Sequence, residues 1–424
     1  MSKVLVYTSP ARGHVYPLVP TLEELRRRGH EIAVRTLSTE VERVRALGFA
    51  VESIDPAIEA REIDDWKASS PPAALLAACR TFVDRGRPEA GDVRRAVERE
   101  RPDVLFVDVN SWGAAAAAEA SGLPWAVFAP YFLPVRAAGV PPWGLGLAPM
   151  GGFPGRMRDT LLWPVVNALY DRALPDLNRL RAAAGVAPFR HVAEFATRSP
   201  LVVYYTAEPF EYARPWPENV RLVGPGIWEP PPDGPGEPVR DGRPLVLVTC
   251  STEYQNDGRL VEVALAGLAS EPVRVVATTA SIDPASFQMP ANGRVERYLP
   301  HGPLLREAAC VVCHGGMGIT QKALAAGVPV CVVPFGRDQL EVARHVEQSG
   351  AGTRLVPRRL TPERLGLAVR EAMGLAAGAR RVAEGFRKAG GARAAAEAIE
   401  ELGAPAGATD PGGERLPTGG EIRD

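Results

Sequence analysis

His314-Gly315-Gly316-Met317-Gly318-Ile319-Thr320 is the segment from which the architecture of this chain is most easily read. An apolar, strand-like run, Cys310 to Cys313, precedes it, and a helix-like run, Thr320 to Ala326, follows it. The first backbone N–H groups of a helix have no partner within the helix, and they carry the positive end of its dipole. Glycines let an anion approach this backbone closely, and a histidine adds a hydrogen-bond donor. The turn therefore favours a diphosphate ligand, held by His314, Gly315, Gly316, Met317 and Gly318.

Short runs of β-branched residues alternate with helical patterns along the rest of the chain, which is typical of parallel α/β sheets. The strands predicted in the first half are Val4–Thr8, Glu31–Thr36, Val51–Ile54, Val104–Asp108, Trp125–Ala129 and Leu201–Thr206. Those predicted in the second half are Leu245–Ser251, Val273–Thr278, Val295–Leu299, Ala309–Cys313, Val328–Val333 and Thr353–Val356. Between the first two strands, Leu18–Arg28 has a helical apolar face, and Gly29 ends it.

The two sets of strands predict two domains. Gly224–Pro244 contains three consecutive prolines and five glycines, and it is interpreted as a linker. We therefore expect two Rossmann-like α/β domains, 1–223 and 245–378, that face each other across a cleft. A last helical pattern covers 379–402, and the Gly- and Pro-rich remainder, 403–424, is expected to be disordered.

Composition limits the possible functions. The 424 residues suit two domains, and 46% apolar with 23% charged residues allows each to bury a core. A net charge of −1 without a basic block gives no reason to expect nucleic acid. No apolar run of eighteen residues occurs, so no membrane-spanning segment is expected. The absence of a signal peptide and an odd count of five cysteines favour a reducing, cytoplasmic location.

Cys310 and Cys313 form a C-x-x-C pattern, for which two interpretations exist. A metal or redox site is one, and ordinary buried strand cysteines are the other. Residues three apart on a strand face opposite sides of the sheet, and the chain contains no second C-x-x-C pair. The pattern therefore favours core cysteines and predicts no metal site.

A second candidate site follows the first predicted strand. The loop from Ser9 to Pro17 contains His14, and Asp108 ends the fourth predicted strand. In open α/β sheets, ligands gather at the carboxyl ends of the strands. A histidine held by a carboxylate has a fixed tautomer and can act as a general base. Alternatively, His14 caps a helix, and Asp108 is the N-cap of a helix that starts near Ser111.

The ordered motifs of the chain resemble those of family-1 nucleotide-sugar glycosyltransferases with the two-domain GT-B fold, in particular bacterial enzymes that act on natural products. The resemblance covers nearly the whole chain and is carried by motifs in both halves. They are Gly13-His14-x-x-Pro17, Arg28-Gly29-His30-Glu31, Tyr298-Leu299-Pro300-His301, Leu304-Leu305, His314-Gly315-Gly316, Ala323-Leu324, Gly327-Val328-Pro329, Pro334, Asp338-Gln339 and Gly350. A lone H-G-G is weak evidence, whereas this string at family spacing is specific.

The resemblance implies a role for each candidate residue. His14 would deprotonate the acceptor hydroxyl, and Asp108 would orient His14. The acceptor oxygen would then attack the anomeric carbon directly, so the configuration inverts. The His314 turn, together with Ser251 and Thr252, would hold the departing diphosphate. Asp338 and Gln339 would bind sugar hydroxyls, although a plain surface turn is the alternative for this pair. The last helix would cross back to the first domain.

Two departures from the family pattern concern the nucleoside. Many members carry a glutamate for the ribose where this chain has Lys322, which cannot accept a hydrogen bond. A deoxyribose donor would explain the change, which favours a dTDP-sugar over a UDP-sugar, and a solvated lysine is the alternative. The segment that usually begins with Trp and ends with Gln here begins with Tyr298 and ends with His301. Tyr298, Leu299 and Pro300 remain the candidates for nucleoside binding.

The acceptor-binding residues are expected in the first domain. Aromatic residues on a Pro- and Gly-rich backbone suit a flat, apolar aglycone, and the candidates are Tyr131, Phe132, Trp143 and Phe153. Trp125 and Phe128 lie on a predicted strand and are better explained as core.

Other chemistries receive less support. No Asp-x-Asp occurs, so we expect metal-independent transfer without a cofactor beyond the nucleotide-sugar co-substrate. P-loop, G-x-S-x-G and H-E-x-x-H motifs are also missing. Two rivals remain within the fold: a sugar-nucleotide 2-epimerase, and a non-catalytic relative that activates a partner enzyme. The sequence does not determine the oligomeric state.

Overall fold

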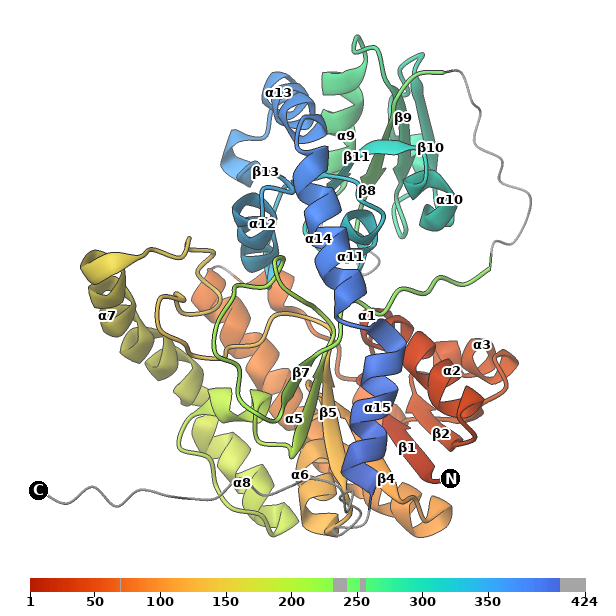
Figure 1. Cartoon of the computed structure of the whole chain (residues 1–424), viewed down its shortest axis with the longest axis vertical. Helices are drawn as coiled ribbons and strands as arrows, with labels where there is room; N and C mark the ends of the chain where they lie inside the picture. Colours follow the sequence, from red (N-terminus) through yellow and green to blue (C-terminus); the bar gives the residue numbers. More distant parts are fainter. Residues whose placement is uncertain (69, 232–241, 252–256, 405–424) are drawn as a thin grey trace, which may run out of the picture.

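The structure, a computed structural model, describes residues 1–68, 70–231, 242–251 and 257–404, and it contains two parallel β-sheets, one above the other in Figure 1. The first sheet consists of β1 (Lys3–Tyr7), β2 (Glu31–Thr36), β3 (Ala50–Ser53), β4 (Val104–Asp108), β5 (Trp125–Ala129), β6 (Leu201–Tyr204) and β7 (Val220–Leu222). The second consists of β8 (Leu245–Thr249), β9 (Arg274–Thr278), β10 (Gly293–Glu296), β11 (Ala308–Cys313), β12 (Val330–Val332) and β13 (Gly352–Arg354). All pairs of neighbouring strands are parallel.

The strand order of each sheet reverses once, and this reversal positions the ligand sites. The order is β3-β2-β1-β4-β5-β6-β7 in the first sheet and β10-β9-β8-β11-β12-β13 in the second. The reversals lie between β1 and β4, where Val4 pairs with Val104, and between β8 and β11, where Leu247 pairs with Val311. At such a point the loops that follow the two strands diverge, and this opens a crevice at the carboxyl ends. The His14 loop follows β1, and the His314 turn follows β11.

Helices cover both faces of the sheets. They are α1 (Arg12–Val15), α2 (Val19–Arg27), α3 (Val41–Ala46), α4 (Pro56–Glu59), α5 (Pro71–Glu100), α6 (Trp112–Ser121), α7 (Gly152–Tyr170) and α8 (Leu174–Ala184) around the first sheet, followed by α9 (Gly258–Leu268), α10 (His301–Leu305), α11 (Met317–Ala325), α12 (Gln339–Gln348), α13 (Pro362–Met373), α14 (Ala376–Lys388) and α15 (Gly391–Gly403). Successive β1 residues alternate between two cores: Leu5 belongs to one and Val6 to the other. In the part of the chain that is described, no helix is both long and apolar enough to span a bilayer.

The predicted strands agree with the observed ones to within a few residues. The sequence interpretation missed β7, whose three residues form a pattern too short to be recognised. The helix predicted at Leu18–Arg28 is α2, preceded by a 3-10 turn, and Gly29 follows it with φ +92°. Cys310 and Cys313 are fully buried in different cores on opposite faces of the second sheet.

The linker interpretation concerns Gly224–Pro244, of which residues 232–241 lie outside the described residues. Its first part packs closely: a Cβ at Gly226 would lie 1.8 Å from the Pro17 carbonyl oxygen. The tail interpretation falls almost entirely on 405–424, which is also outside the described residues.

The final helical pattern is two helices instead of one. Gly390 and Gly391, with φ of +88° and +58°, separate α14 from α15, because a left-handed backbone ends a helix. Helix α14 packs on α11 of the second domain, and α15 packs on α2 of the first (Figure 1). The C-terminal segment therefore crosses between the domains.

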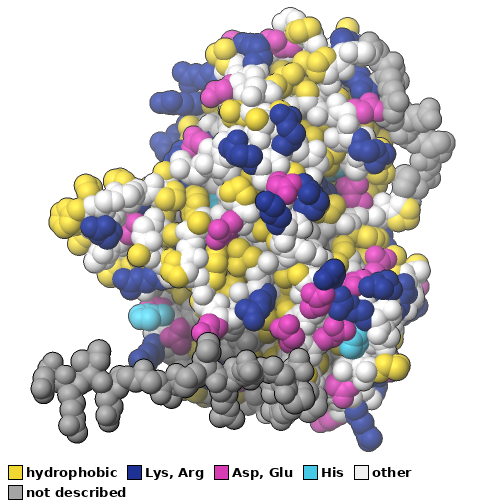
Figure 2. All heavy atoms as spheres, in the orientation of Figure 1, with side chains coloured by type: hydrophobic (Ala, Val, Ile, Leu, Met, Phe, Trp, Pro, Cys, Tyr) yellow, Lys and Arg dark blue, Asp and Glu magenta, His cyan; other side chains and the backbone are white. Residues whose placement is uncertain are grey.

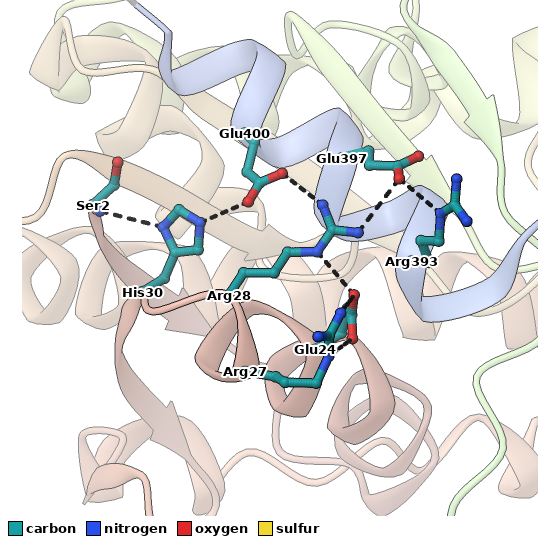
Figure 3. A network of polar contacts seen from close by, with 8 residues as sticks. All are labelled: Ser2, Glu24, Arg27, Arg28, His30, Arg393, Glu397 and Glu400. Atoms are coloured by element: carbon teal, nitrogen blue, oxygen red, sulfur yellow. Dashed lines mark hydrogen bonds and ion pairs between the residues drawn. The ribbon is translucent and has the colours of Figure 1, made fainter.

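A polar network joins α15 to the first domain, as Figure 3 shows. Arg28 donates to Glu400 at 2.8 Å, and its charge also lies 3.4 Å from Glu397. The Ser2 backbone N–H donates to His30 Nδ1, so Nε2 carries the proton that is donated to Glu400 at 2.9 Å. The Arg28-Gly29-His30 motif thus anchors the C-terminal helix.

The domains also meet directly along α12. Glu341 Oε1 accepts hydrogen bonds from the backbone N–H groups of Gly144 and Gly146, at 2.8 and 2.7 Å. The Arg344 side chain donates to the Gly146 carbonyl oxygen at 2.9 Å. Burial raises the pKa of Glu341 to about 7. Helix α12 therefore holds the segment that leads to α7.

Candidate active site

His14 and Asp108 form a hydrogen-bonded pair at the reversal point of the first sheet. His14 Nδ1 lies 2.9 Å from Asp108 Oδ2 and 3.0 Å from Oδ1. The Asp108 side chain is fully buried, and it also accepts from the Ser9 hydroxyl at 2.8 Å and from the backbone N–H groups of Ser9 and Asn110. The structure thus brings together two residues that are 94 positions apart in the sequence.

The charge state of Asp108 follows from these contacts. Burial opposes its ionisation, but the His14 imidazole and the donated hydrogen bonds outweigh burial and lower the pKa of Asp108 below its usual value. An ionised Asp108 accepts only, so His14 carries a proton on Nδ1, and its neutral form then has the lone pair on Nε2. This is the tautomer that a general base requires.

Asn110 is a contributor that sequence interpretation missed. The Tyr131 hydroxyl donates to Asn110 Oδ1 at 2.7 Å, and Asn110 Nδ2 lies 3.4 Å from His14 Nε2. Because its oxygen is engaged by Tyr131, the amide presents N–H to the unprotonated Nε2. The only signal in the sequence is its position two residues after Asp108.

The His314 turn has the geometry of an anion site. Gly315 has φ +95°, which favours glycine, and a Cβ at Gly316 would lie 2.5 Å from His314 Nε2. Around Gly318 a Cβ would meet nothing within 4 Å, so the helix start is open there. Met317 is 7% exposed and belongs to the core, so it can offer the ligand only its backbone N–H.

Further groups surround His314 at the end of β8. The Ser251 backbone N–H donates to Asp257 at 2.6 Å, and His314 Nδ1 is 3.8 Å from the same carboxylate. Burial lowers the pKa of His314, Asp257 opposes this effect, and Arg337 adds to it. Thr252 lies outside the described residues.

Asp338 and Gln339 follow β12 but differ in role. Burial raises the pKa of Asp338, and the neighbouring Arg337 charge opposes that rise. Gln339 is 2% exposed, and its Oε1 accepts the backbone N–H groups of Phe335 and Gly336 at 2.7 and 3.0 Å. That oxygen shapes its own loop, so the part of Gln339 left for a sugar hydroxyl is its amide NH2, and sugar binding by Asp338 and Gln339 stays a prediction.

The predicted nucleoside residues lie between β10 and α10. Tyr298 is 48% exposed, Leu299 packs partly against the core, and Pro300 is the N-cap of α10. His301 Nε2 lies 3.0 Å from the Thr278 hydroxyl, and burial lowers the pKa of His301 to about 4.

Lys322 is half-buried and engaged in an ion pair, so the interpretation as a solvated lysine is wrong. Its Nζ lies 2.9 Å from Glu229 Oε1, and Glu229 also accepts from the backbone N–H of Gly302 at 2.8 Å. This carboxylate comes from the segment after β7 and ties that segment to α10 and α11.

The predicted acceptor residues separate into two groups. Tyr131 lies beside the base, with its ring centroid 5.8 Å from that of His14. Trp143 is partly buried and lies 6.0 Å from Tyr170, centroid to centroid. The Trp143 indole N–H and the Tyr170 hydroxyl have no hydrogen-bond partner within the described part of the chain. Tyr131 thus presents an aromatic ring beside His14, whereas Trp143 and Tyr170 form a separate aromatic pair in which Tyr170 is buried.

Phe132 and Phe153 take part in neither the His14–Tyr131 contact nor the Trp143–Tyr170 contact. Phe132 is 1% exposed and stacks on His345 of α12 at 3.8 Å, so it is part of the contact between the domains. Phe153 is 64% exposed at the start of α7, on the outer edge of the first domain in Figure 1. It is one of four exposed apolar side chains at four-residue spacing on α7, with Met157, Leu161 and Val165, and Figure 2 shows apolar side chains gathered on this edge of the molecule.

Comparison with solved structures defines the class of the fold. The glycosyltransferase of kitacinnamycin matches with a TM-score of 0.76 at 21% identity, over 95% of this chain and 98% of that one. The calicheamicin glycosyltransferase CalG4 matches with a TM-score of 0.72 at 22% identity, again over 95% and 98%. The two sheets with facing reversal points are therefore the GT-B glycosyltransferase fold.

Sequence comparison defines the family. Residues 263–402 match the model of the erythromycin biosynthesis protein CIII-like C-terminal domain. The chain is 35% identical over 392 residues to 4'-demethylrebeccamycin synthase of Lentzea aerocolonigenes, covering 88% of this chain and 92% of that protein. It is 31% identical over 306 residues to a PGL/p-HBAD biosynthesis glycosyltransferase of Mycobacterium tuberculosis, covering 69% of each. The chain belongs to the family-1 glycosyltransferases of the natural-product type and is an enzyme.

Proposed function

We propose that this glycosyltransferase transfers a sugar, with inversion, from a dTDP- or UDP-sugar to a hydroxyl group or a nitrogen of an apolar natural-product aglycone. The observation that carries the proposal is the His14–Asp108 hydrogen bond of 2.9 Å at the carboxyl ends of β1 and β4, with the Asp108 side chain fully buried. A base on one domain and an anion-binding turn on the other suit a reaction in which acceptor and donor arrive from opposite sides.

The residues divide the reaction between them. His14 Nε2 takes the proton of the acceptor hydroxyl, whose oxygen forms a bond to the anomeric carbon. The bond from that carbon to the diphosphate oxygen breaks, and the electron pair leaves with the diphosphate. The start of α11, His314 and Ser251 stabilise the resulting charge. Attack opposite to the leaving group inverts the anomeric configuration.

The proposal includes independence from metal ions and from any cofactor. Its support is the donor set at the His314 turn, where backbone N–H groups and an imidazole supply the partial positive charge. Nucleotide-sugar transfer in the presence of EDTA tests this point.

The nucleotide and the acceptor are proposed from chemistry and from relatives. A glycosyltransferase of the same fold, VinC, has been solved in complex with dTDP, at 20% identity and a TM-score of 0.67 over 95% of this chain and 99% of that one. Lys322, engaged with Glu229, offers no acceptor to a ribose 2′-hydroxyl, which favours dTDP. For the acceptor, the Tyr131 ring beside His14 suits a flat aglycone.

Calorimetric titration with dTDP and UDP, side by side and without metal, tests the donor site without knowledge of the acceptor. We expect at least one of the two nucleotides to bind, and the affinity for dTDP to be higher than that for UDP. If neither binds, the assigned donor site is wrong. Conversion of the nucleotide-sugar without an acceptor would favour the epimerase, and binding without turnover would favour an activating partner protein.

A further inference from the structure

An ion pair joins the two domains beside the proposed donor site. Arg337 Nε lies 3.2 and 3.1 Å from the two carboxylate oxygens of Asp65, and Nη2 lies 3.0 Å from Oδ1. Asp65 is in a 3-10 turn, Asp65–Lys67, that precedes α5 in the first domain. Its side chain is 6% exposed and that of Arg337 is 25% exposed, so the pair is mostly shielded from water. Shielded, forked contacts of this kind fix a guanidinium in one orientation.

The backbone at Arg337 is unusual for an arginine. Its φ is +54°, a left-handed conformation that glycine or asparagine adopts more easily. The loop is held in this shape by Gln339, whose side-chain oxygen binds the Phe335 and Gly336 N–H groups. A disfavoured backbone persists where the surroundings over-determine it, and such positions cluster at functional sites. The loop thus directs a guanidinium across the boundary between the domains.

The loop that carries Arg337 packs against the His314 turn, because a Cβ at Gly315 would lie 3.3 Å from the Cβ and from the backbone oxygen of Gln339. After burial and Asp257, its charge is the next influence on the pKa of His314, which it lowers. After burial and its own backbone, Arg337 is the next influence on the pKa of Asp338, which it also lowers. The Arg337 cation therefore lowers the pKa of both His314, which is assigned to the diphosphate, and Asp338, which is assigned to the sugar.

We propose that Arg337 stabilises the diphosphate of the donor and that Asp65, from the opposite domain, positions Arg337 for this task. The inference rests on the proposed function. As the glycosidic bond breaks, the leaving oxygen gains the electron pair, and a guanidinium is well suited to bind that charge. Because Asp65 belongs to the acceptor domain, the guanidinium is oriented only when the domains are together. Charge stabilisation thereby depends on domain closure.

The competing explanation is a contact that only holds the domains together. In that case, loss of either side chain lowers thermal stability and leaves nucleotide affinity unchanged. A contact with the β-phosphate instead weakens nucleoside diphosphate binding and leaves nucleoside monophosphate binding unchanged, because the monophosphate lacks that group.

Calorimetric titration of the full chain with dTDP, UDP, dTMP and UMP separates the two explanations. For Arg337→Gln we expect the affinity for the diphosphates to fall about 10–150-fold, the range for one charge-assisted hydrogen bond. Monophosphate affinity should stay within about twofold by the same reasoning. Arg337→Lys, which keeps the charge and loses the fork, should lie between native and Arg337→Gln.

Asp65→Asn tests the positioning role. It should weaken diphosphate binding by a smaller factor than Arg337→Gln, and it should add nothing when combined with Arg337→Gln. Asp64→Asn is the matched control, because its carboxylate pairs with Lys67 at 3.7 Å and is 58% exposed. This control should bind dTDP and UDP as the native chain does.

The outcomes are distinct. Native-like diphosphate affinity in folded Arg337→Gln and Arg337→Lys, with only a lower melting temperature, overturns this inference and leaves the proposed function standing. If the native chain binds no nucleoside diphosphate, the proposed function fails and this inference fails with it.

Discussion

Replacing Asp108 with asparagine removes the charge that orients His14, while the size of the side chain hardly changes. In the native chain, Asp108 Oδ2 accepts from Ser9 N–H and Ser9 O–H, and Oδ1 accepts from the Asn110 N–H at 2.8 Å. Every partner of this buried carboxylate, His14 Nδ1 included, is therefore a donor. An asparagine NH2 must face at least one of them. The least costly relief is for His14 to move its proton to Nε2, because Nδ1 can then accept from the amide.

The expected loss of rate follows from these contacts. The charge-assisted bond to His14 is worth about 1.5–3 kcal/mol, which corresponds to about 10–150-fold in rate. The change of tautomer also withdraws the base, whose loss typically reduces the rate about 10²–10⁴-fold. Because both effects act through one imidazole, they do not add fully, and we expect kcat to fall about 10²–10⁴-fold. The affinity for dTDP should not change, because the donor groups lie on the other domain.

Two measurements test this reasoning. Nitrogen-15 NMR of the six histidines, with His14 assigned from His14→Ala, should show Nδ1–H in the native chain and Nε2–H in Asp108→Asn. The rate of nucleoside diphosphate release with a panel of aromatic hydroxyl acceptors should fall in parallel. Asp103→Asn is the control, since Asp103 accepts from the exposed Lys3 N–H near the opposite end of β4. A native rate and an unchanged tautomer in Asp108→Asn would refute the assigned mechanism.

Three further predictions concern stability. Burial raises the pKa of Glu89 to about 8, so the native state keeps a proton that the unfolded chain loses near pH 4.5. The free energy of unfolding should therefore decline by up to about 5 kcal/mol as the pH rises from 4.5 to 8. Urea unfolding of the native and Glu89→Gln proteins at pH 5.5 and 8.5 measures this decline, which the substitution should abolish. An equal decline in both proteins contradicts the prediction. Glu341→Ala leaves the N–H groups of Gly144 and Gly146 unpaired and should lower stability by about 2–5 kcal/mol and speed proteolysis of residues 137–151. Glu341→Gln keeps the acceptor oxygen and should resemble the native chain. Arg28→Ala should reduce hydrogen-exchange protection of α15 and lower stability by about 1–3 kcal/mol. Arg27→Ala, which removes a contact with Glu24 inside α2, should not. Equal protection in the two variants rules out the network as an anchor.

Sequence interpretation succeeded where the signal is local. The strands and the His314 turn follow from hydrophobic periodicity and from glycines that leave room for backbone or ligand. It failed at β7, which is too short for a period, and at the final helix, where the break at Gly390 interrupts an otherwise continuous helical pattern.

The acceptor residues show where local signals end. Tyr131 and Phe132 are adjacent aromatics on the same irregular segment, yet one contacts the base and the other is buried against His345. The motif assigns Gln339 to the sugar, and it gives no sign that the side-chain oxygen accepts from the backbone of its own loop. Side-chain direction on irregular backbone depends on what packs against it, which the order of residues does not reveal.

By itself the sequence determined the α/β class, the division into two sheets and the family, and it made His14, after β1, and Asp108, at the end of β4, a candidate pair. Only the tertiary structure revealed the Asn110–Tyr131 link to His14, the hold of Glu341 on Gly144 and Gly146, and the pair of Arg337 with Asp65. Arg337 and Asp65 are 272 positions apart in the sequence. Strand and turn formation depends on neighbouring residues along the chain, whereas contacts between domains depend on how two independently formed surfaces come together.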